Sequence, residues 1–128
     1  MRIIVLGATG MAGTAVVNEA LSRGHEVTAV SRRRRHLAGA GVTSCLLDVT
    51  DVESVAGLLT DSDAIVVALR PPAGHESDLA RLTTAVLDAA SRSRTPLLII
   101  GGAAALSSPT DPGTLAIDDP TIVPPAWR

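Results

Sequence analysis

The sequence predicts an α/β fold in which a parallel sheet of about five strands carries helices on both faces. The chain has 128 residues, enough for one domain with a sizeable core. Hydrophobic residues make up 46% and charged residues 19%, a balance typical of a globular chain. Short apolar runs alternate with stretches in which apolar residues recur at helical spacing. Such alternation is typical of parallel strands joined by right-handed helical crossovers.

Five apolar runs are the predicted strands. The first, Arg2–Leu6, is continuously apolar after Arg2 and stops at Gly7, as expected for a strand buried on both faces. The other four runs cover residues 26–30, 42–47, 64–69 and 97–100. Prolines follow the fourth run and paired glycines follow the fifth, so both strands are expected to end there.

Three stretches predict helices. Residues 11–23 carry apolar positions at helical spacing, and Gly24 supplies the stop. The pattern Thr50-x-x-Glu53 is a capping-box signature and predicts that Thr50 caps the second helix. The longest apolar stripe predicts a third helix over 76–92. The crossover between the second and third strands leaves room for only a turn or two of helix.

The composition changes after Leu106. Residues 107–128 hold five of the eight prolines, at positions 109, 112, 120, 124 and 125. We therefore expect a domain at 1–106 and a Pro-rich C-terminal arm at 107–128. Within the arm, the β-branched run at 121–123 is expected to add one edge strand.

A glycine-rich turn follows the first predicted strand. Gly7, Gly10 and Gly13 lie between that strand and the first helix. In the related G-x-G-x-x-G pattern, the first glycine permits a sharp turn, the second lets backbone approach a pyrophosphate, and the third lets helix pack on strand. The free amides of the helix N-terminus then attract phosphates. The turn therefore predicts a Rossmann-type doubly wound sheet that binds a dinucleotide, with a purely structural turn as the less favoured alternative.

The end of the second strand indicates which dinucleotide is bound. A chain that binds NAD carries an acidic residue about 20 residues past the glycine turn, where it binds the ribose 2′-hydroxyl. Here the strand is followed by four arginines, residues 32–35. Guanidinium groups bind a 2′-phosphate through paired, charge-assisted hydrogen bonds. Arg32 and Arg33 therefore predict NADP as the cofactor, with NADPH preferred over NADH; for Arg34 and Arg35 a solvated basic run is the alternative.

Two more strand ends carry candidate ligand contacts, because ligands of open parallel sheets bind at the carboxyl ends of the strands. Asp48 follows the third strand, where its carboxylate fits either an adenine contact or the N-terminus of the next helix. Ala68, Leu69 and Arg70 end the fourth strand, and a small residue there lets backbone approach the cofactor.

The runs at residues 3–13, 31–32 and 47–51 together resemble the atypical short-chain dehydrogenase/reductase superfamily, above all its NmrA-like and NAD(P)H-flavin (biliverdin-IXβ) reductase-like members. The resemblance implies that the glycine turn surrounds the pyrophosphate, Arg32 holds the 2′-phosphate, Asp48 and Val49 flank adenine, and residues 68–70 line the ribose and nicotinamide. It also implies further elements and a substrate lid beyond the length of this chain. The predicted cofactor-binding residues are Gly7, Thr9, Gly10, Met11, Ala12, Gly13, Arg32, Arg33, Asp48, Val49, Ala68, Leu69 and Arg70.

The chain departs from that superfamily in its proton-transfer residues. Its oxidoreductases commonly use a Tyr-x-x-x-Lys pair, but these 128 residues contain no Tyr, and all eleven basic residues are Arg. A dehydrogenase mechanism that needs this pair is excluded within the chain. Hydride transfer to a flavin, quinone or similar conjugated acceptor is not excluded, because the cofactor carries the difficult chemistry. Catalytic residues remain unassigned, with water, Ser107 or Ser108 expected as the proton source.

The leading hypothesis is thus an NADPH-dependent reductase of a small-molecule acceptor. A non-catalytic NAD(P)-binding redox sensor of the NmrA-like type is the alternative, and a relative of sugar-nucleotide epimerases is a weaker one.

The net charge of −2 argues against nucleic-acid or anionic-membrane partners. Three scattered histidines predict no metal site. Without a signal peptide or a membrane-spanning run, the chain is expected in the cytoplasm. The fifth strand is expected to expose an edge unless the arm, a second copy or a partner covers it.

Overall fold

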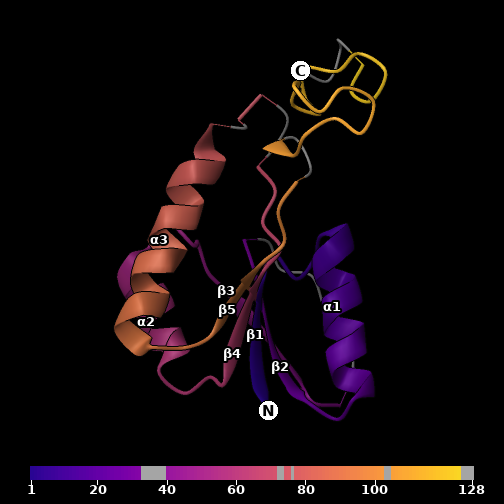
Figure 1. Ribbon diagram of the computed structural model, residues 1–128. Coiled ribbons are helices and arrows are strands. Elements are labelled where there is room, and N and C mark those ends of the chain that lie inside the picture. The colour runs from indigo at the N-terminus through magenta and orange to yellow at the C-terminus, as the bar shows by residue number, and fades with distance from the viewer. Residues whose placement is uncertain (33–39, 72–73, 76, 103–104, 125–128) are drawn as a thin grey trace.

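The computed structural model describes residues 1–32, 40–71, 74–75, 77–102 and 105–124. Its centre is a sheet of five parallel strands in the order β3-β2-β1-β4-β5. Helix α1 covers one face of this sheet, and helices α2 and α3 cover the other (Figure 1). The predicted Rossmann-type doubly wound sheet is confirmed. The strands are β1 (Arg2–Leu6), β2 (Glu26–Ser31), β3 (Val42–Leu46), β4 (Ala64–Val67) and β5 (Leu97–Ile99); the helices are α1 (Met11–Ser22), α2 (Val52–Leu59) and α3 (Asp78–Ser93).

Strands β3, β4 and β5 are one or two residues shorter than predicted. Leu47, Ala68 and Ile100 follow their strands directly, and each still donates one backbone hydrogen bond to the end of the neighbouring strand. Beyond these bonds the chain leaves the sheet. The apolar character of the sequence continues past β3 and β4 because Leu47 and Leu69 still pack against the apolar core beneath α2 and α3.

The two faces of the sheet have separate apolar cores. Beneath α2 and α3, Val55 and Leu59 of α2 and Val86 of α3 pack with the inward residues of β1, β2 and β4. Beneath α1, Val17 and Ala20 pack on alternate residues of the same strands. Because β1 and β4 are covered on both faces, their residues are almost all apolar and the two central strands are fixed firmly.

The predicted Thr50 cap of α2 is wrong. Asp51 occupies the N-cap position, and its carboxylate accepts hydrogen bonds from the backbone N–H and the hydroxyl of Ser54. Thr50 instead donates its hydroxyl and its N–H to the carboxylate of Asp48, 2.9 and 3.0 Å away. Aspartate caps a helix at least as well as threonine. The nearby Asp48 carboxylate takes up the Thr50 hydroxyl, so the helix begins one residue later than the capping-box pattern predicts.

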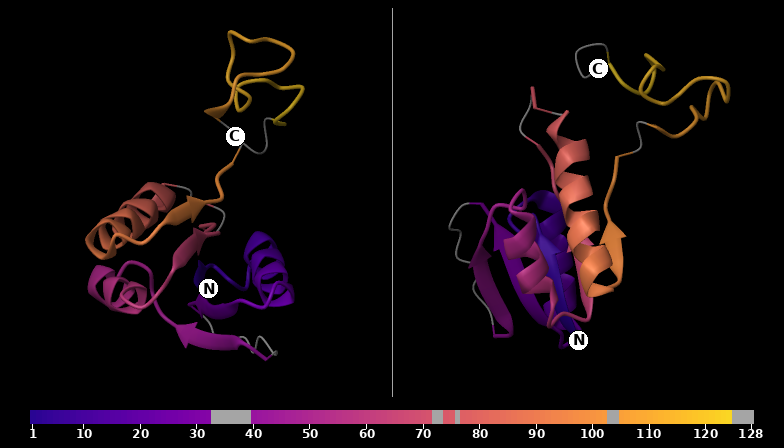
Figure 2. Two further views of the ribbon diagram at one scale, coloured as in Figure 1. Left: turned by 60° about the horizontal axis from the view of Figure 1, so that its bottom comes forward. Right: turned by 90° about the vertical axis from the view of Figure 1, so that its left-hand side faces the viewer.

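The arm is organised around one buried carboxylate. Asp119 accepts hydrogen bonds from the hydroxyls of Ser108, Thr110 and Thr121 and from the Thr121 N–H. The predicted strand at 121–123 is wrong, because the N–H groups of Ile122 and Val123 turn back to the carbonyl of Asp119. These hydrogen bonds hold the pKa of the Asp119 carboxyl far below its ordinary value. The described part of the arm lies beyond the carboxyl ends of the strands (Figure 2).

Strand β5 lies at the edge of the sheet. Within the described residues it pairs with β4 alone, and Leu98 is 61% exposed. The described part of the arm does not run along this edge (Figure 2). None of the helices in the described ranges is long and apolar enough to cross a membrane.

Two glycines allow α1 to approach the sheet closely. A Cβ on Gly13 would lie 2.1 Å from the carbonyl oxygen of Gly7, far inside contact distance. Gly7 has φ +82°, and a Cβ there would lie 2.4 Å from the carbonyl oxygen of Ala68. The predicted roles of the first and third glycines, a sharp turn and close helix packing, are therefore met by backbone contacts.

We expect Gly13→Ala to destabilise the fold and Gly57→Ala to stabilise it. The first substitution forces a methyl group against the Gly7 carbonyl and should cost about 1–3 kcal/mol in the free energy of unfolding. Gly57 lies inside α2, and a Cβ there meets nothing within 4 Å. Alanine should therefore add about 0.5–1 kcal/mol through helix propensity. Urea denaturation measures both, and a tolerated Gly13→Ala would contradict the close-packing account.

The Asp119 cluster should make the arm sensitive to acid. Because the folded pKa lies below the unfolded one, the ionised carboxylate stabilises the arm above the ordinary Asp pKa of about 3.9, and this stabilisation is lost as pH falls below it. The protection of the amides at residues 108–123, measured against their intrinsic exchange rates at the same pH, should therefore fall at low pH in the unaltered chain. Asp119→Asn should exchange fast at neutral pH already, whereas Asp118→Asn, its exposed neighbour, is the control.

Candidate functional site

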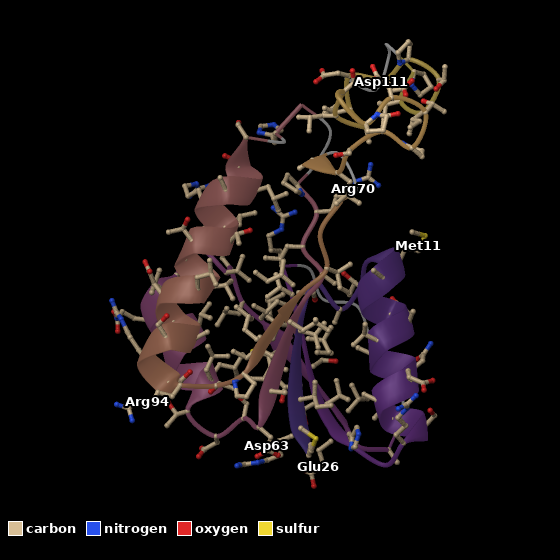
Figure 3. All side chains as sticks on the ribbon, viewed as in Figure 1. Met11, Glu26, Asp63, Arg70, Arg94 and Asp111 are labelled. Carbon is tan, nitrogen blue, oxygen red and sulfur yellow. The ribbon has the colours of Figure 1, made fainter. Side chains whose placement is uncertain are left out.

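The candidate site lies at the carboxyl edge of the sheet, where the order of the strands reverses beside β1. The chain leaves β1 upward into the glycine turn, and α1 begins immediately afterwards. β4 and β5 lie on the other side of β1 from β2 and β3. Crevices at such switch points are where open parallel sheets bind ligands. Met11 at the start of α1 and Arg70 after β4 both lie at this edge, whereas Glu26 and Asp63 lie at the opposite one (Figure 3).

The glycine turn presents backbone amides to this edge. The N–H of Gly10 donates to the carbonyl of Gly7 at 3.0 Å, which closes the turn, and Gly10 is the N-cap of α1. Glycine has no side chain to cap the first amides of the helix, and these have no partner within the helix. Their N–H groups and the helix dipole make this a favourable place for a phosphate.

Gly10 differs from the other two glycines of the turn. Its φ is −78°, and a Cβ there would meet only the Gly7 carbonyl, at an ordinary 3.4 Å. Neither packing nor backbone conformation therefore demands glycine at this position. Gly10 is exposed, and the neighbouring Met11 is 93% exposed. What glycine leaves open at position 10 is the outer face of the turn, the space that an approaching ligand would use.

A small pocket opens beside the turn. It lies between the carboxyl ends of β1, β2 and β4 and the segment that follows β3. Leu82 of α3 also lines it. Its walls are aliphatic and its rim carries two guanidinium groups. The lining residues are Gly7, Thr9, Val30, Ser31, Arg32, Leu47, Val49, Leu69, Arg70 and Leu82.

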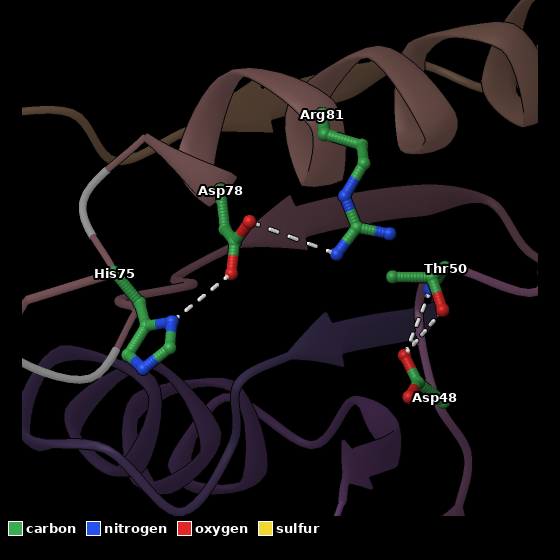
Figure 4. A network of polar contacts seen from close by, with 5 residues as sticks. All are labelled: Asp48, Thr50, His75, Asp78 and Arg81. Carbon is green, nitrogen blue, oxygen red and sulfur yellow. Dashed lines mark hydrogen bonds and ion pairs between the residues drawn. The ribbon is translucent and has the colours of Figure 1, made fainter.

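The carboxylate of Asp48, beside this pocket, has two arginines near it, Arg32 and Arg81. Asp48 has its pKa lowered first by the hydrogen bonds from Thr50 and then by the charges of Arg32 and Arg81. Arg81 comes from α3 and lies 3.8 Å from Asp78, and Figure 4 shows it between Asp78 and the pair of Asp48 and Thr50. Arg70, in the pocket wall after β4, adds a third guanidinium group, while Asp51 and Asp78 are further carboxylates near Asp48 and Arg81.

The structure brings most of the predicted residues together. Gly7, Thr9, Arg32, Val49, Leu69 and Arg70 line the pocket. Gly10, Met11 and Ala12 form the open end of α1 beside it, and Gly13 lies buried beneath the turn. Asp48 accepts the Thr50 hydrogen bonds and is not part of α2, and Ala68 packs its carbonyl against Gly7. Arg33 lies outside the described residues.

Sequence reasoning missed several site residues. Leu82 belongs to the apolar stripe that predicts α3, and nothing in that stripe shows that it reaches the pocket. Arg81 is an ordinary solvent-facing residue in the sequence pattern.

Ser108, expected as a proton source, is 1% exposed and donates to Asp119, so its hydroxyl is already used in a hydrogen bond within the arm.

A larger hollow of about 560 Å³ lies at the opposite edge of the sheet. It is bordered by the amino ends of β1, β2 and β3 and the end of α2, with Arg2, Glu26 and Asp61 among its lining residues. This edge has neither the glycine turn nor a helix N-terminus. Its size does not outweigh the missing phosphate-binding groups, so we place the candidate site at the carboxyl edge.

Comparisons with known proteins agree with this geometry. The sequence profile of the NAD(P)H-binding family matches residues 7–123. The uncharacterized Bacillus subtilis protein YwnB is 33% identical over 123 residues, covering 94% of this chain and 56% of YwnB. The chain thus spans little more than half the length of that relative.

Solved structures show the same fold. A Burkholderia pseudomallei protein described as a candidate exported protein has a TM-score of 0.79 at 31% identity, over 99% of this chain and 59% of its own. A Streptococcus pneumoniae protein described as a candidate NADH-flavin reductase has a TM-score of 0.76 at 30% identity, over 94% of this chain and 56% of its own. A candidate epimerase from Bacteroides thetaiotaomicron has a TM-score of 0.79 at 28% identity, over 92% and 54%.

The family profile includes the glycine turn, the carboxyl ends of β2, β3, β4 and β5, and the described part of the arm up to residue 123. The fold, the turn and the profile lead to one conclusion: the chain belongs to the NAD(P)H-binding family.

Proposed function

We propose that this chain binds NADPH at the carboxyl edge of its sheet and serves the reduction of a flavin, quinone or similar conjugated acceptor. The observation that carries the proposal is the glycine turn. Backbone packing requires glycine at positions 7 and 13 but not at position 10. The open outer face of the turn at Gly10 adjoins the first amides of α1. A pyrophosphate at this place would use the space that Gly10 leaves.

We place the rest of the dinucleotide according to the charges and walls of the pocket. Arg32, directly after β2, would hold the 2′-phosphate of NADPH. In chains that bind NAD, an acidic residue at this place holds the 2′-hydroxyl instead. The Asp48 carboxylate, kept ionised by Thr50, is an acceptor suited to the amino group of adenine. Aliphatic Val49 and Leu82 offer flat apolar contact to the base. Leu69 and Arg70 lead from this pocket along the edge toward β4 and β5.

The acceptor class follows from the residues that the chain has and lacks. Bound NADPH supplies a hydride, which carries two electrons to the acceptor as NADP⁺ forms. Without Tyr or Lys, the chain cannot provide the usual proton donor of a carbonyl reductase. A conjugated ring spreads the incoming charge and tolerates a weaker proton donor. The Streptococcus pneumoniae neighbour described as a candidate NADH-flavin reductase supports this class.

A non-catalytic NAD(P)-binding sensor is the second candidate, because the missing Tyr and Lys suit it equally. Steady-state oxidation of NADPH in the presence of FMN, FAD, menadione or a benzoquinone separates the two. Turnover supports the reductase. Saturable nucleotide binding without turnover on any of these acceptors would favour the sensor.

Arg32→Ala should remove the preference for NADPH. The lost charge-assisted hydrogen bonds to the 2′-phosphate are worth about 1.5–3 kcal/mol, or roughly 10- to 150-fold in Kd. Binding of NADH, which has no 2′-phosphate, should change less than threefold. Nicotinamide fluorescence measures both titrations. Arg23→Ala, at the far end of α1 where Arg23 pairs with Glu19, is the matched control. An unchanged ratio of the two Kd values would remove Arg32 from the 2′-phosphate site.

Gly10→Ala should weaken NADPH binding without unfolding the chain. The added methyl group enters the open face of the turn, where it displaces the pyrophosphate, so we expect at least a tenfold rise in Kd. The free energy of unfolding should fall by only about 1 kcal/mol, the difference between Gly and Ala at an N-cap. Isothermal titration and urea denaturation of the same sample report the two effects. A variant that is stable and binds normally would show that the phosphates lie elsewhere.

A further inference from the structure

Strand β5 leaves one edge of the sheet unpaired. Among the described residues it pairs with β4 alone, and the described part of the arm does not run along it (Figure 2). The carbonyl of Pro96 and the N–H of Ile100 bond to β4 or its neighbouring residues. Because bonding groups alternate along a strand, the N–H and C=O groups of Leu97 and Ile99 point outward. Such outward groups can pair with a further strand.

The side chains of β5 are aliphatic on both faces of the sheet. Leu98 lies opposite Val66 of β4, on the face that carries α1. It stays 61% exposed because α1 packs over β1 and β2 and does not extend to β5. Ile99 lies on the other face, where Leu97 packs against the core beneath α2 and α3, and it is 41% exposed. Both faces of the edge therefore present apolar surface to solvent.

Helix α3 extends this apolar surface. Leu87 is 43% exposed and lies five residues before Arg92, whose ion pair with Glu53 marks the side of α3 that faces α2. Five residues turn a helix by about 140°, so Leu87 faces away from α2. Figure 2 shows β5 at the end of the sheet away from α2, beside α3. We call Leu87, Leu98, Ile99 and Ile100 the β5 patch.

The strand in the β5 patch has none of the residues that usually protect a free edge. Exposed edge strands commonly carry charged residues or proline, which discourage pairing with another chain. From Leu97 to Gly102 the sequence contains neither. At the opposite edge of the sheet, β3 has the polar residues Thr43 and Ser44 near its centre. A neutral surface suits contact between identical copies, because each group in a two-fold interface meets its own counterpart or a close neighbour.

Arg94, at the end of α3, indicates the orientation of a second copy. Its φ is +54°, a left-handed conformation that favours glycine at a helix end. Its side chain is exposed, and none of the ion pairs among the described residues includes it. The described arm, residues 105–124, contains three aspartates and no basic residue, and Asp111 and Asp118 are exposed. In an antiparallel pair of β5 strands, Arg94 of one copy lies toward the end of the edge from which the acidic arm of the other copy begins. Charge complementarity therefore favours a second copy in this orientation.

We propose that two copies of this chain pair edge to edge through β5, antiparallel about a two-fold axis at Leu98. About this axis, Leu97 of one copy lies opposite Ile99 of the other, so the outward N–H and C=O groups of both residues are paired. The two Leu98 side chains then face each other, at the Cβ separation of about 4.5–5.5 Å typical of opposed residues. On the other face of the sheet, the two Leu87 side chains are turned toward the partner helix. The result is one continuous sheet with five strands from each copy.

The first test is the mass of the chain in solution. Sedimentation equilibrium from micromolar to millimolar concentrations should show a reversible dimer of twice the chain mass of 13.1 kDa. Leu98→Lys places like charges opposite each other and should raise the dimer Kd by at least about tenfold. Leu46→Lys is the matched control, because Leu46 is 60% exposed on the other edge strand, and it should leave the dimer unchanged. A single-chain mass throughout, or a dimer that persists in Leu98→Lys, would overturn the proposal.

The second test mixes two variants of the same position. Leu98→Lys and Leu98→Glu should each be mainly monomeric, whereas an equal mixture should form a mixed dimer, because opposite charges then face each other across the axis. Recovery in the mixture excludes a folding defect in either variant. A mixture that stays as monomeric as its components would overturn the two-fold axis at Leu98.

Arg94 is tested by the salt dependence of the dimer. Arg94→Ala should raise the dimer Kd by about two- to fivefold and reduce its dependence on salt, as expected for an exposed ion pair. Arg92→Ala is the matched control, because Arg92 pairs with Glu53 of its own chain. Equal effects of the two substitutions would overturn the contact between Arg94 and the arm of the other copy.

Amide hydrogen exchange distinguishes the other ways of covering this edge. The N–H of Ile99 should be protected at high concentration and lose that protection on dilution. Protection in a monomer would mean that the arm of the same chain covers the edge, and assemblies that keep growing with concentration would mean open stacking. Either result would overturn the closed dimer. The pocket at the carboxyl ends of β1, β2 and β4 lies outside the β5 patch, so Leu98→Lys should bind NADPH as the unaltered chain does.

Discussion

The contact between Gly13 and the carbonyl of Gly7 is the constraint on which the site depends. A side chain at position 13 would push α1 away from β1, since its Cβ would lie 2.1 Å from that carbonyl. With α1 in contact, the first turn of the helix sits directly beside the end of β1, and its amides lie at the carboxyl edge of the sheet. Gly7 makes a second backbone contact, with Ala68. That contact fixes how the chain leaves β4, and so where Leu69 and Arg70 lie.

Backbone and side chains contribute different things to this site. The phosphate-binding groups are amides, which any sequence provides once the turn and helix are placed. Selectivity among nucleotides must come from side chains, and under the proposed function it comes from the guanidinium groups and the Asp48 carboxylate. Thr50 has a part in this although it fails as a helix cap. By donating to Asp48 twice, it stabilises the carboxylate and orients it at the rim.

The parts of the structure predicted from sequence are those that local patterns determine. Strand alternation and glycine spacing indicated the sheet and the turn, because burial on both faces and close packing each restrict residue type at given positions. The Thr50 cap failed because Asp48 accepts the hydroxyl and N–H of Thr50, while Asp51 accepts the N–H and hydroxyl of Ser54 at the start of α2. The predicted strand at 121–123 does not form because the N–H and the hydroxyl of Thr121 donate to the carboxylate of Asp119 and not to an edge of the sheet. Arg81 and Leu82 could not be found because their relation to the pocket depends on where α3 packs.

The absence of Tyr and Lys bears on the proposed chemistry and not on the glycine turn. The groups proposed to hold the cofactor are the amides of α1 and the guanidinium groups after β2 and β4, and none of them belongs to a Tyr or a Lys. The packing of α1 against β1, which places those amides, depends on Gly7 and Gly13. Under the proposed function, nucleotide binding therefore does not need the Tyr-x-x-x-Lys pair, whereas the proton must come from another source. Nucleotide binding is for this reason common to the reductase and to the sensor, and turnover alone separates them.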